Sequence, residues 1–261
     1  MVNIIKMDMY RLFKSKSFKV VLIIVIILNL INGSIDRLST YLTAKSVAEG
    51  EEPVVWAKTI AFSGFLKKPV FYFDCIMTLL SIVWFSHSDI SHGYIKNIAG
   101  QLPKKGHTVI SKFIVVGMHN FLLLFVAVIA QTIGYLPYCS IDFGDDLGNG
   151  ILHFWIKWLL LLSISAIIIL FSSGLKSKNA ATTIAVVMGG KIMTLTYMLI
   201  SAGIQKIPLD CLKDFNLSKY MPDSLMTSSE PDVKRSIIVS LAIIVVFMTA
   251  TVKIFNKKDV N

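Results

Sequence analysis

The chain has 261 residues, of which 54% are hydrophobic and 16% are charged. A soluble domain of this length needs more polar surface to cover its core, so the composition excludes a soluble protein and indicates a membrane protein. The formal net charge is +10. We attribute it to membrane topology and anionic lipid rather than to nucleic acid, because no basic segment stands apart from the apolar stretches.

The first 17 residues predict an interfacial amphipathic helix that lies along the cytoplasmic face of the membrane. Ile5, Met9, Leu12 and Phe13 recur at helical spacing, and basic residues fill other positions of the helical wheel. Two roles stay open for this helix. It is either an anchor only, or it transmits motion from a cytoplasmic partner into the first span.

Six apolar stretches follow, in residues 18–35, 70–86, 113–136, 151–173, 180–203 and 236–254. A helix of about 20 apolar residues crosses a bilayer, and a chain inside lipid must satisfy its own backbone hydrogen bonds. No two-residue alternation recurs that would predict a barrel. The sequence therefore predicts an all-α polytopic protein, in which residues 18–261 form one transmembrane domain of six helices.

Basic residues collect in the connections on one side of these spans. The N-terminal arm, the second-to-third and fourth-to-fifth connections and the C-terminal tail carry a net charge of +11, whereas the other three connections carry −2. The positive-inside rule then places both termini in the cytoplasm. In this topology residues 205–235 form an external segment, in which Pro208 and Pro222 predict short interfacial helices.

Asp74 in the second apolar stretch and Lys191 near the middle of the fifth are ionisable residues inside predicted spans. A charge inside the membrane is costly unless it is hydrated or paired. Lys191 either snorkels or faces a helix interface, or it lines a translocation path for an anionic or amphipathic substrate; pairing with Asp74 is a further alternative. The adjacent Gly189 and Gly190 permit either close helix packing or a break in the helix.

Catalytic motifs are missing from the sequence. It contains no H-E-x-x-H, no G-x-S-x-G and no Walker A motif. We therefore expect no enzyme activity, no metal site and no cofactor in this chain. Cys139 and Cys211 both fall in external connections, where a disulfide is chemically permitted, although two free thiols are the simpler expectation.

The longest cytoplasmic connection, residues 87–112, carries Asp89, Gly93, Tyr94, Lys96 and Asn97. This segment resembles the permease subunits of the type-2 family of ABC exporters, which includes the bacitracin and lantibiotic export and immunity systems. Those chains carry an acidic residue, then Gly-Thr, then Lys-Asn at this place. The glycine, lysine and asparagine match here, whereas Asp89 replaces the usual Glu and Tyr94 replaces the usual Thr.

The N-terminal arm fits the same resemblance, because Tyr10, Arg11 and Phe13 lie in a segment that looks like the elbow helix of that family. The resemblance implies a multi-pass protein of the bacterial plasma membrane. It also implies that residues 87–112 form a coupling segment that docks on a separate cytosolic ATPase, with Asp89 near the start of a short helix. The simpler alternative is that residues 87–112 form a solvated loop whose charges serve only membrane topology.

The resemblance further implies a second permease, either another copy of the chain or a sibling, and two ATPase subunits that bind ATP and Mg²⁺. Its substrate would be a peptide antibiotic or another amphipathic compound that is exported across the cell membrane. The alternative from another class is a membrane anchor or a sensor or immunity subunit that transports nothing.

Overall fold

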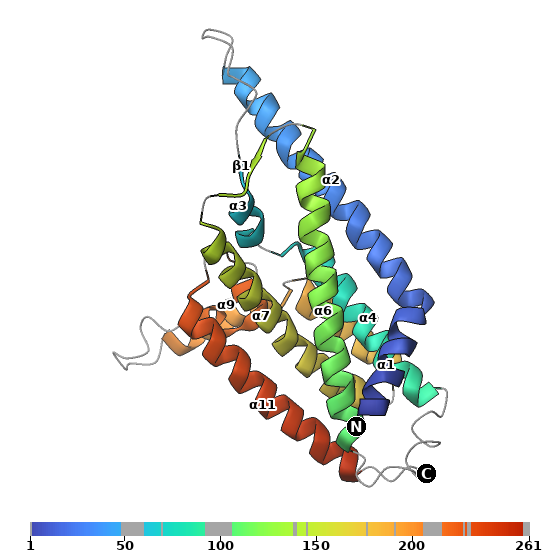
Figure 1. Cartoon of the computed structure of the whole chain (residues 1–261). Coiled ribbons are helices and arrows are strands. Elements are labelled where there is room, and N and C mark those ends of the chain that lie inside the picture. The colour runs from blue at the N-terminus through green and yellow to red at the C-terminus, as the bar shows by residue number, and fades with distance from the viewer. Residues whose placement is uncertain are drawn as a thin grey trace.

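The computed structural model describes residues 2–47, 60–68, 70–91, 106–137, 140–144, 146–175, 177–190, 192–205, 216–226, 228 and 231–257, without the side chains of 36–47, 89–91 and 257. Most of this chain is helical, as the composition predicts (Figure 1). The N-terminal half contains α1 (Val2–Lys14), α2 (Lys16–Val47), α3 (Phe62–Lys67), α4 (Tyr72–Ser91) and α6 (Gly106–Tyr135). The C-terminal half contains α7 (Leu147–Gly174), α8 (Lys178–Gly189), α9 (Ile192–Gln205), α10 (Pro222–Met226) and α11 (Val233–Lys257).

Four helices of the described chain are long and apolar enough to cross a membrane: Lys16–Ile35 within α2, and α6, α7 and residues Val233–Asn256 of α11. A bent pair, α8 and α9, adds a fifth if the two helices form one span. The structure thus confirms a mostly helical protein, and its four or five long apolar helices are compatible with a multi-pass membrane protein. The number six stays a prediction, although α4 occupies the second predicted stretch.

The fifth predicted span, residues 180–203, is divided between two helices, and the break is one of the two alternatives that the glycine pair leaves open. Helix α8 ends at Gly189, α9 begins at Ile192, and their axes differ by 70°. A Cβ atom on Gly189 would lie 2.9 Å from the backbone nitrogen and Cα of Ile76, so this glycine lets α8 touch the backbone of α4. The glycine pair therefore serves both of the roles that the sequence permits, since the helix packs closely and also breaks there.

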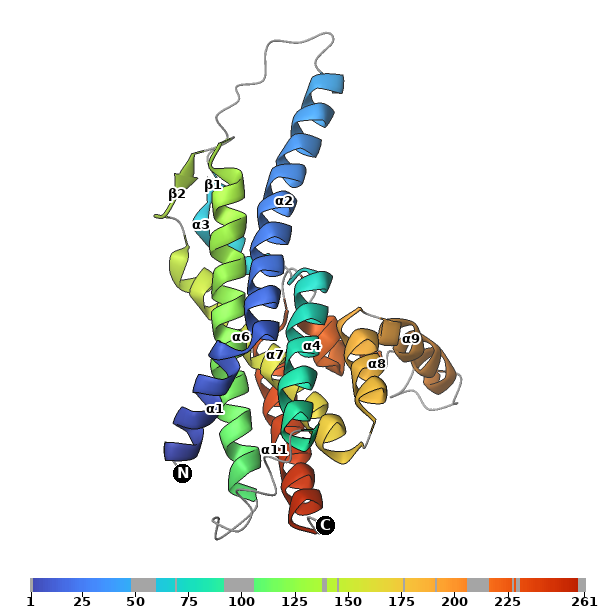
Figure 2. The same cartoon turned by 90° about the vertical axis from the view of Figure 1, so that its right-hand side faces the viewer.

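The long helices pack in neighbouring pairs around α7. Helix α2 runs along α6, and α11 runs along α7 (Figures 1 and 2). The first pair is in backbone contact, because a Cβ atom on Gly134 would lie 2.7 Å from the carbonyl oxygen of Leu30. Helix α7 supplies much of the core, with Leu160, Ile164 and Ile168 fully buried. Small residues and one central helix thus bring the other helices close together.

The two ends of the molecule differ in structure. Strand β1 (Ile60–Ala61) pairs in parallel with β2 (Ile141–Asp142) at one end, and α1 and the C-terminal end of α11 lie at the other (Figures 1 and 2). The beginning of α6 and the end of α4 also lie toward the α1 end. This arrangement agrees with the alternation of charged connections. Which end faces the cytoplasm stays a prediction.

Within the predicted external segment, residues 216–226 contain two short helices, whereas most of the residues for which we predict such helices lie outside the described residues. The two helices are the 3-10 helix η2 (Leu217–Tyr220) and α10, which begins at Pro222. Helix α10 packs on α7 and buries Leu225 and Met226 in the core. Residues 206–215, including Cys211, and also Cys139 lie outside the described residues, as does any disulfide between them.

Candidate functional site

Helix α1 meets α2 at a fixed elbow. Ser15 separates the two helices, and its hydroxyl donates to the Leu12 carbonyl at 2.7 Å and accepts from the backbone N–H of Phe18 at 3.2 Å. The ring of Phe13 packs edge to face against Phe18, with centroids 5.0 Å apart. One side chain therefore ends α1 and caps α2, and an aromatic pair fixes the angle between them.

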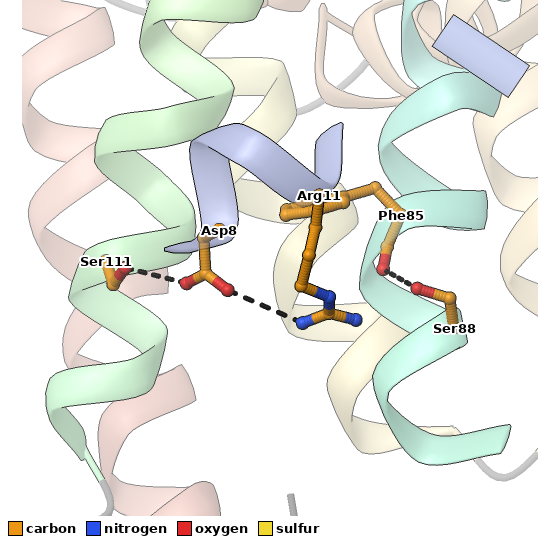
Figure 3. A network of polar contacts seen from close by, with 5 residues as sticks. All are labelled: Asp8, Arg11, Phe85, Ser88 and Ser111. Carbon is orange, nitrogen blue, oxygen red and sulfur yellow. Dashed lines mark hydrogen bonds and ion pairs between the residues drawn. The ribbon is translucent and has the colours of Figure 1, made fainter. Parts of the chain in front are cut away.

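A buried carboxylate ties α1 to the first turns of α6. Asp8 is 2% exposed, and its side chain accepts a hydrogen bond from the Ser111 hydroxyl at 2.7 Å (Figure 3). Arg11 lies 3.5 Å from the other oxygen of the same carboxylate. A carboxylate that has lost its water is stable only with such partners, so Asp8 holds α1 in one register on α6.

Arg11 also faces the end of α4. It lies between Asp8 and the turn of α4 where the Ser88 hydroxyl donates to the Phe85 carbonyl (Figure 3). Arg11 and Ser88 line one cavity of about 110 Å³ between the two helices. Helix α1 thus packs on the start of α6 and lies beside the end of α4, the two points between which residues 92–105 run.

The structure places the predicted elbow residues in three different positions. Arg11 points into the molecule, and Phe13 packs at the elbow itself. Tyr10 is exposed, and its hydroxyl accepts a hydrogen bond from Lys14 at 2.6 Å. Sequence reasoning missed Asp8, although an acidic residue on the apolar side of an amphipathic helix is a signal that could have found it.

Most of the predicted coupling residues lie outside the described residues, namely Gly93, Tyr94, Lys96 and Asn97. The backbone of Asp89 lies in the last turn of α4, which continues to Ser91. Asp89 is therefore not at the start of a separate short helix, because α4 extends past the predicted end of the second span. The negative end of the helix dipole does not favour a carboxylate there.

A second polar site lies inside the bundle, around Asp74. This residue is 6% exposed, and one of its oxygens accepts a hydrogen bond from the Asn29 side chain of α2 at 2.8 Å. The other oxygen is buried without a hydrogen-bond partner in the described structure. Asp74 lines a cavity of about 40 Å³ together with Asn32, Gln131 and Lys157. A water molecule occupies about 30 Å³ in the liquid, so this polar chamber has room for solvent but not for a peptide.

Lys157 is the residue of the chamber that sequence reasoning missed. It is 2% exposed, and its ammonium group donates to the Leu66 carbonyl at 2.9 Å and to the Lys68 carbonyl. These carbonyls end α3, where a helix leaves backbone acceptors unpaired and carries partial negative charge. Lys191, for which pairing with Asp74 is one alternative, lies outside the described residues. A lysine within the fourth apolar stretch was the available signal for Lys157.

A third polar group joins the middle of three helices. His119 of α6 lies 3.0 Å from the Ser81 hydroxyl of α4, and Asn120 donates to the Ser165 hydroxyl of α7 at 2.8 Å. All four side chains are at most 2% exposed. This polar layer satisfies its members mutually, so it holds the three helices together at one depth.

Comparison with known proteins adds no assignment. No protein-family model matches the chain, and no curated protein matches it.

Proposed function

We propose that this chain is the membrane-spanning permease subunit of an ATP-driven exporter, powered by a separate cytosolic ATPase. One observation supports this proposal most strongly. Asp8 binds α1 to the start of α6, and Arg11 faces the end of α4 across a small shared cavity, so α1 lies against both sides of residues 92–105. A push on that connection would therefore move α1, the end of α4 and the start of α6 as one body, which is what a subunit driven by an external motor requires.

The resemblance of residues 87–112 to the type-2 family of ABC exporters supplies the identity of the motor. Under this proposal the α1 end of the molecule faces the cytoplasm, and Asp89, Gly93, Tyr94, Lys96 and Asn97 contact the ATPase. ATP and Mg²⁺ bind to that partner, and a second permease, either a copy or a sibling, completes the transporter. The substrate is a peptide antibiotic or another amphipathic compound.

Within the membrane we propose that Asp74 lies beside the translocation path, together with Lys191. Asp74 supports this role because it keeps one unpaired oxygen in a polar chamber between α2, α4, α6 and α7. The chamber is too small for the substrate itself. Asp74 would therefore act by binding water between the helices that move apart during transport, or by holding those helices in order. Asp74→Asn should lower export while membrane insertion is unchanged.

The test places a single cysteine at Lys96 in a chain whose three native cysteines are replaced by alanine. The matched control is a single cysteine at Phe143, which is exposed beside β2 at the opposite end. In intact cells a membrane-impermeant maleimide should label position 143 and not position 96. After permeabilisation it should label both, because residues 87–112 then become accessible.

A cysteine-linked photocrosslinker at position 96 should then capture a protein that carries a Walker A motif, and the same crosslinker at position 143 should not. External labelling of position 96 would overturn the proposal, since no cytosolic ATPase could reach it. A cytoplasmic position 96 without a captured ATPase would favour the alternative of a membrane anchor or a sensor or immunity subunit.

A further inference from the structure

A groove with both cationic and apolar walls lies on the outer side of the elbow between α1 and α2. It measures about 580 Å³ and is lined by Lys6, Met9, Tyr10, Phe13, Lys14 and Lys19. Asp8 and Leu12, in contrast, are the buried side of α1. The hydrogen bonds of Ser15 fix the elbow, so the groove is present before any ligand arrives.

The charge of this groove has one sign. Three lysines line it, and none of its lining residues in the described structure is acidic. The ammonium group of Lys14 donates to the Tyr10 hydroxyl at 2.6 Å and lies 5.0 Å from the centre of its ring. Tyr10 therefore positions one of the three charges, and the contact leaves two further N–H donors of Lys14 for an anion.

An apolar track begins where the cationic groove ends. From Lys19 the next side chains at four-residue spacing along α2 are Ile23, Ile27 and Ile31, and each is about half exposed. Residues four apart lie on one face of a helix, so the track continues directly from Lys19. Cationic groups at one end of an exposed apolar strip match a molecule with an anionic head group and long hydrocarbon chains.

We propose that this groove is a binding site for one anionic phospholipid. Lys6, Lys14 and Lys19 hold the phosphate, Tyr10 orients Lys14, and the acyl chains lie along the isoleucines of α2. A free phosphate ion would use the lysines alone and leave the apolar track unused. The site is independent of the proposed transport function, because it requires only the elbow and α2.

The experiment measures the melting temperature of the purified full chain in detergent while phosphatidylglycerol or phosphatidylcholine is added. Phosphatidylglycerol should raise the melting temperature saturably and phosphatidylcholine should not. In the variant Lys6→Gln/Lys14→Gln/Lys19→Gln the apparent Kd for phosphatidylglycerol should rise about tenfold or more, since each lysine near an anionic surface contributes measurably. The matched control is Lys16→Gln/Lys178→Gln/Lys253→Gln, which removes the same charge from exposed lysines outside the groove and should bind as the wild type does.

Equal loss of binding in both triple variants would overturn the proposal, because it would show diffuse charge attraction. A rise in melting temperature with inorganic phosphate alone would overturn it as well, because it would show an ion site. Should the groove triple variant fail to fold, Lys14→Gln alone keeps the other basic residues of the N-terminal arm. This single variant should raise the apparent Kd for phosphatidylglycerol about fivefold. If its Kd equals that of the wild type, Lys14 does not hold the phosphate and the proposal is contradicted.

Discussion

The buried carboxylate of Asp8 makes the docking of α1 open to a direct test. Replacing Asp8 with alanine removes the acceptor of the Ser111 hydroxyl and the ion-pair partner of Arg11. A hydrogen bond to a charged group contributes about 1.5–3 kcal/mol. Since α1 buries only Asp8 and Leu12 fully, that bond is a large part of what keeps the helix docked. The undocked population of α1 should therefore rise about 10- to 150-fold.

The assay follows a cysteine placed at Leu12, which is 3% exposed while α1 is docked. In a chain whose native cysteines are replaced by alanine, maleimide reacts with this thiol only when α1 leaves α6. The reaction rate then reports the undocked fraction. Asp8→Ala should raise this rate by the factor expected for the undocked population, measured against the same cysteine variant with Asp8 intact.

Asp232 supplies a matched control directly before α11, whose start lies across the bundle from the elbow (Figure 1). It also pairs with an arginine three residues later, at 3.7 Å, but its side chain is half exposed. An exposed pair contributes little, and it lies far from the elbow. Asp232→Ala should therefore leave the maleimide rate at position 12 unchanged. If Asp8→Ala leaves it unchanged too, Asp8 does not hold α1, and the proposed joint motion of α1, α4 and α6 loses its support.

Three further outcomes follow from the same structure. Gly134→Ala should lower the melting temperature by several degrees, because its Cβ would meet the α2 backbone at 2.7 Å, whereas Gly148→Ala, with no atom within 4 Å, should not. Lys157→Met should cost about 1–3 kcal/mol in thermal unfolding, because two buried carbonyls lose their donor. Hydrogen bonds from Lys67 and from the side-chain amide of Asn149 hold the pKa of Asp146 below its ordinary 3.8. These bonds therefore stabilise the β1–β2 end above about pH 4, and their contribution is lost as the pH falls through the lowered pKa. Amide exchange near β2 should show this loss, and Asp146→Asn should remove its pH dependence.

Much of the helical architecture could be predicted from the sequence, because lipid leaves the backbone few choices. The apolar stretches give the positions of α2, α6, α7 and α11, and the periodicity of the first 17 residues gives α1. The predicted ends of these helices are less accurate than their positions. Helix α2 continues to Val47 and α6 begins at Gly106, because a polar sequence outside the apolar layer can remain helical without any signal in hydropathy.

The polar sites depend on which helices become neighbours, and hydropathy does not contain that information. Asp74 is visible in the sequence as a charge in an apolar stretch, but its partner Asn29 lies 45 positions earlier on another helix. Lys157 finds its acceptors 89 and 91 positions earlier, at the end of a six-residue helix. The close packing of Gly189 on Ile76 of α4 likewise depends on which helix lies beside it, and the glycine pair does not contain that information.

The layer of Ser81, His119, Asn120 and Ser165 has a consequence for how the protein assembles. Once inserted, helices in a bilayer gain no hydrophobic free energy by associating, because hydrocarbon surrounds them in either state. Sliding α6 by one turn, about 5.4 Å, would separate His119 from Ser81 and Asn120 from Ser165. These hydrogen bonds therefore form only when α6 has its native register against α4 and α7. During assembly in the membrane, a misaligned intermediate lacks them and is less stable than the native arrangement.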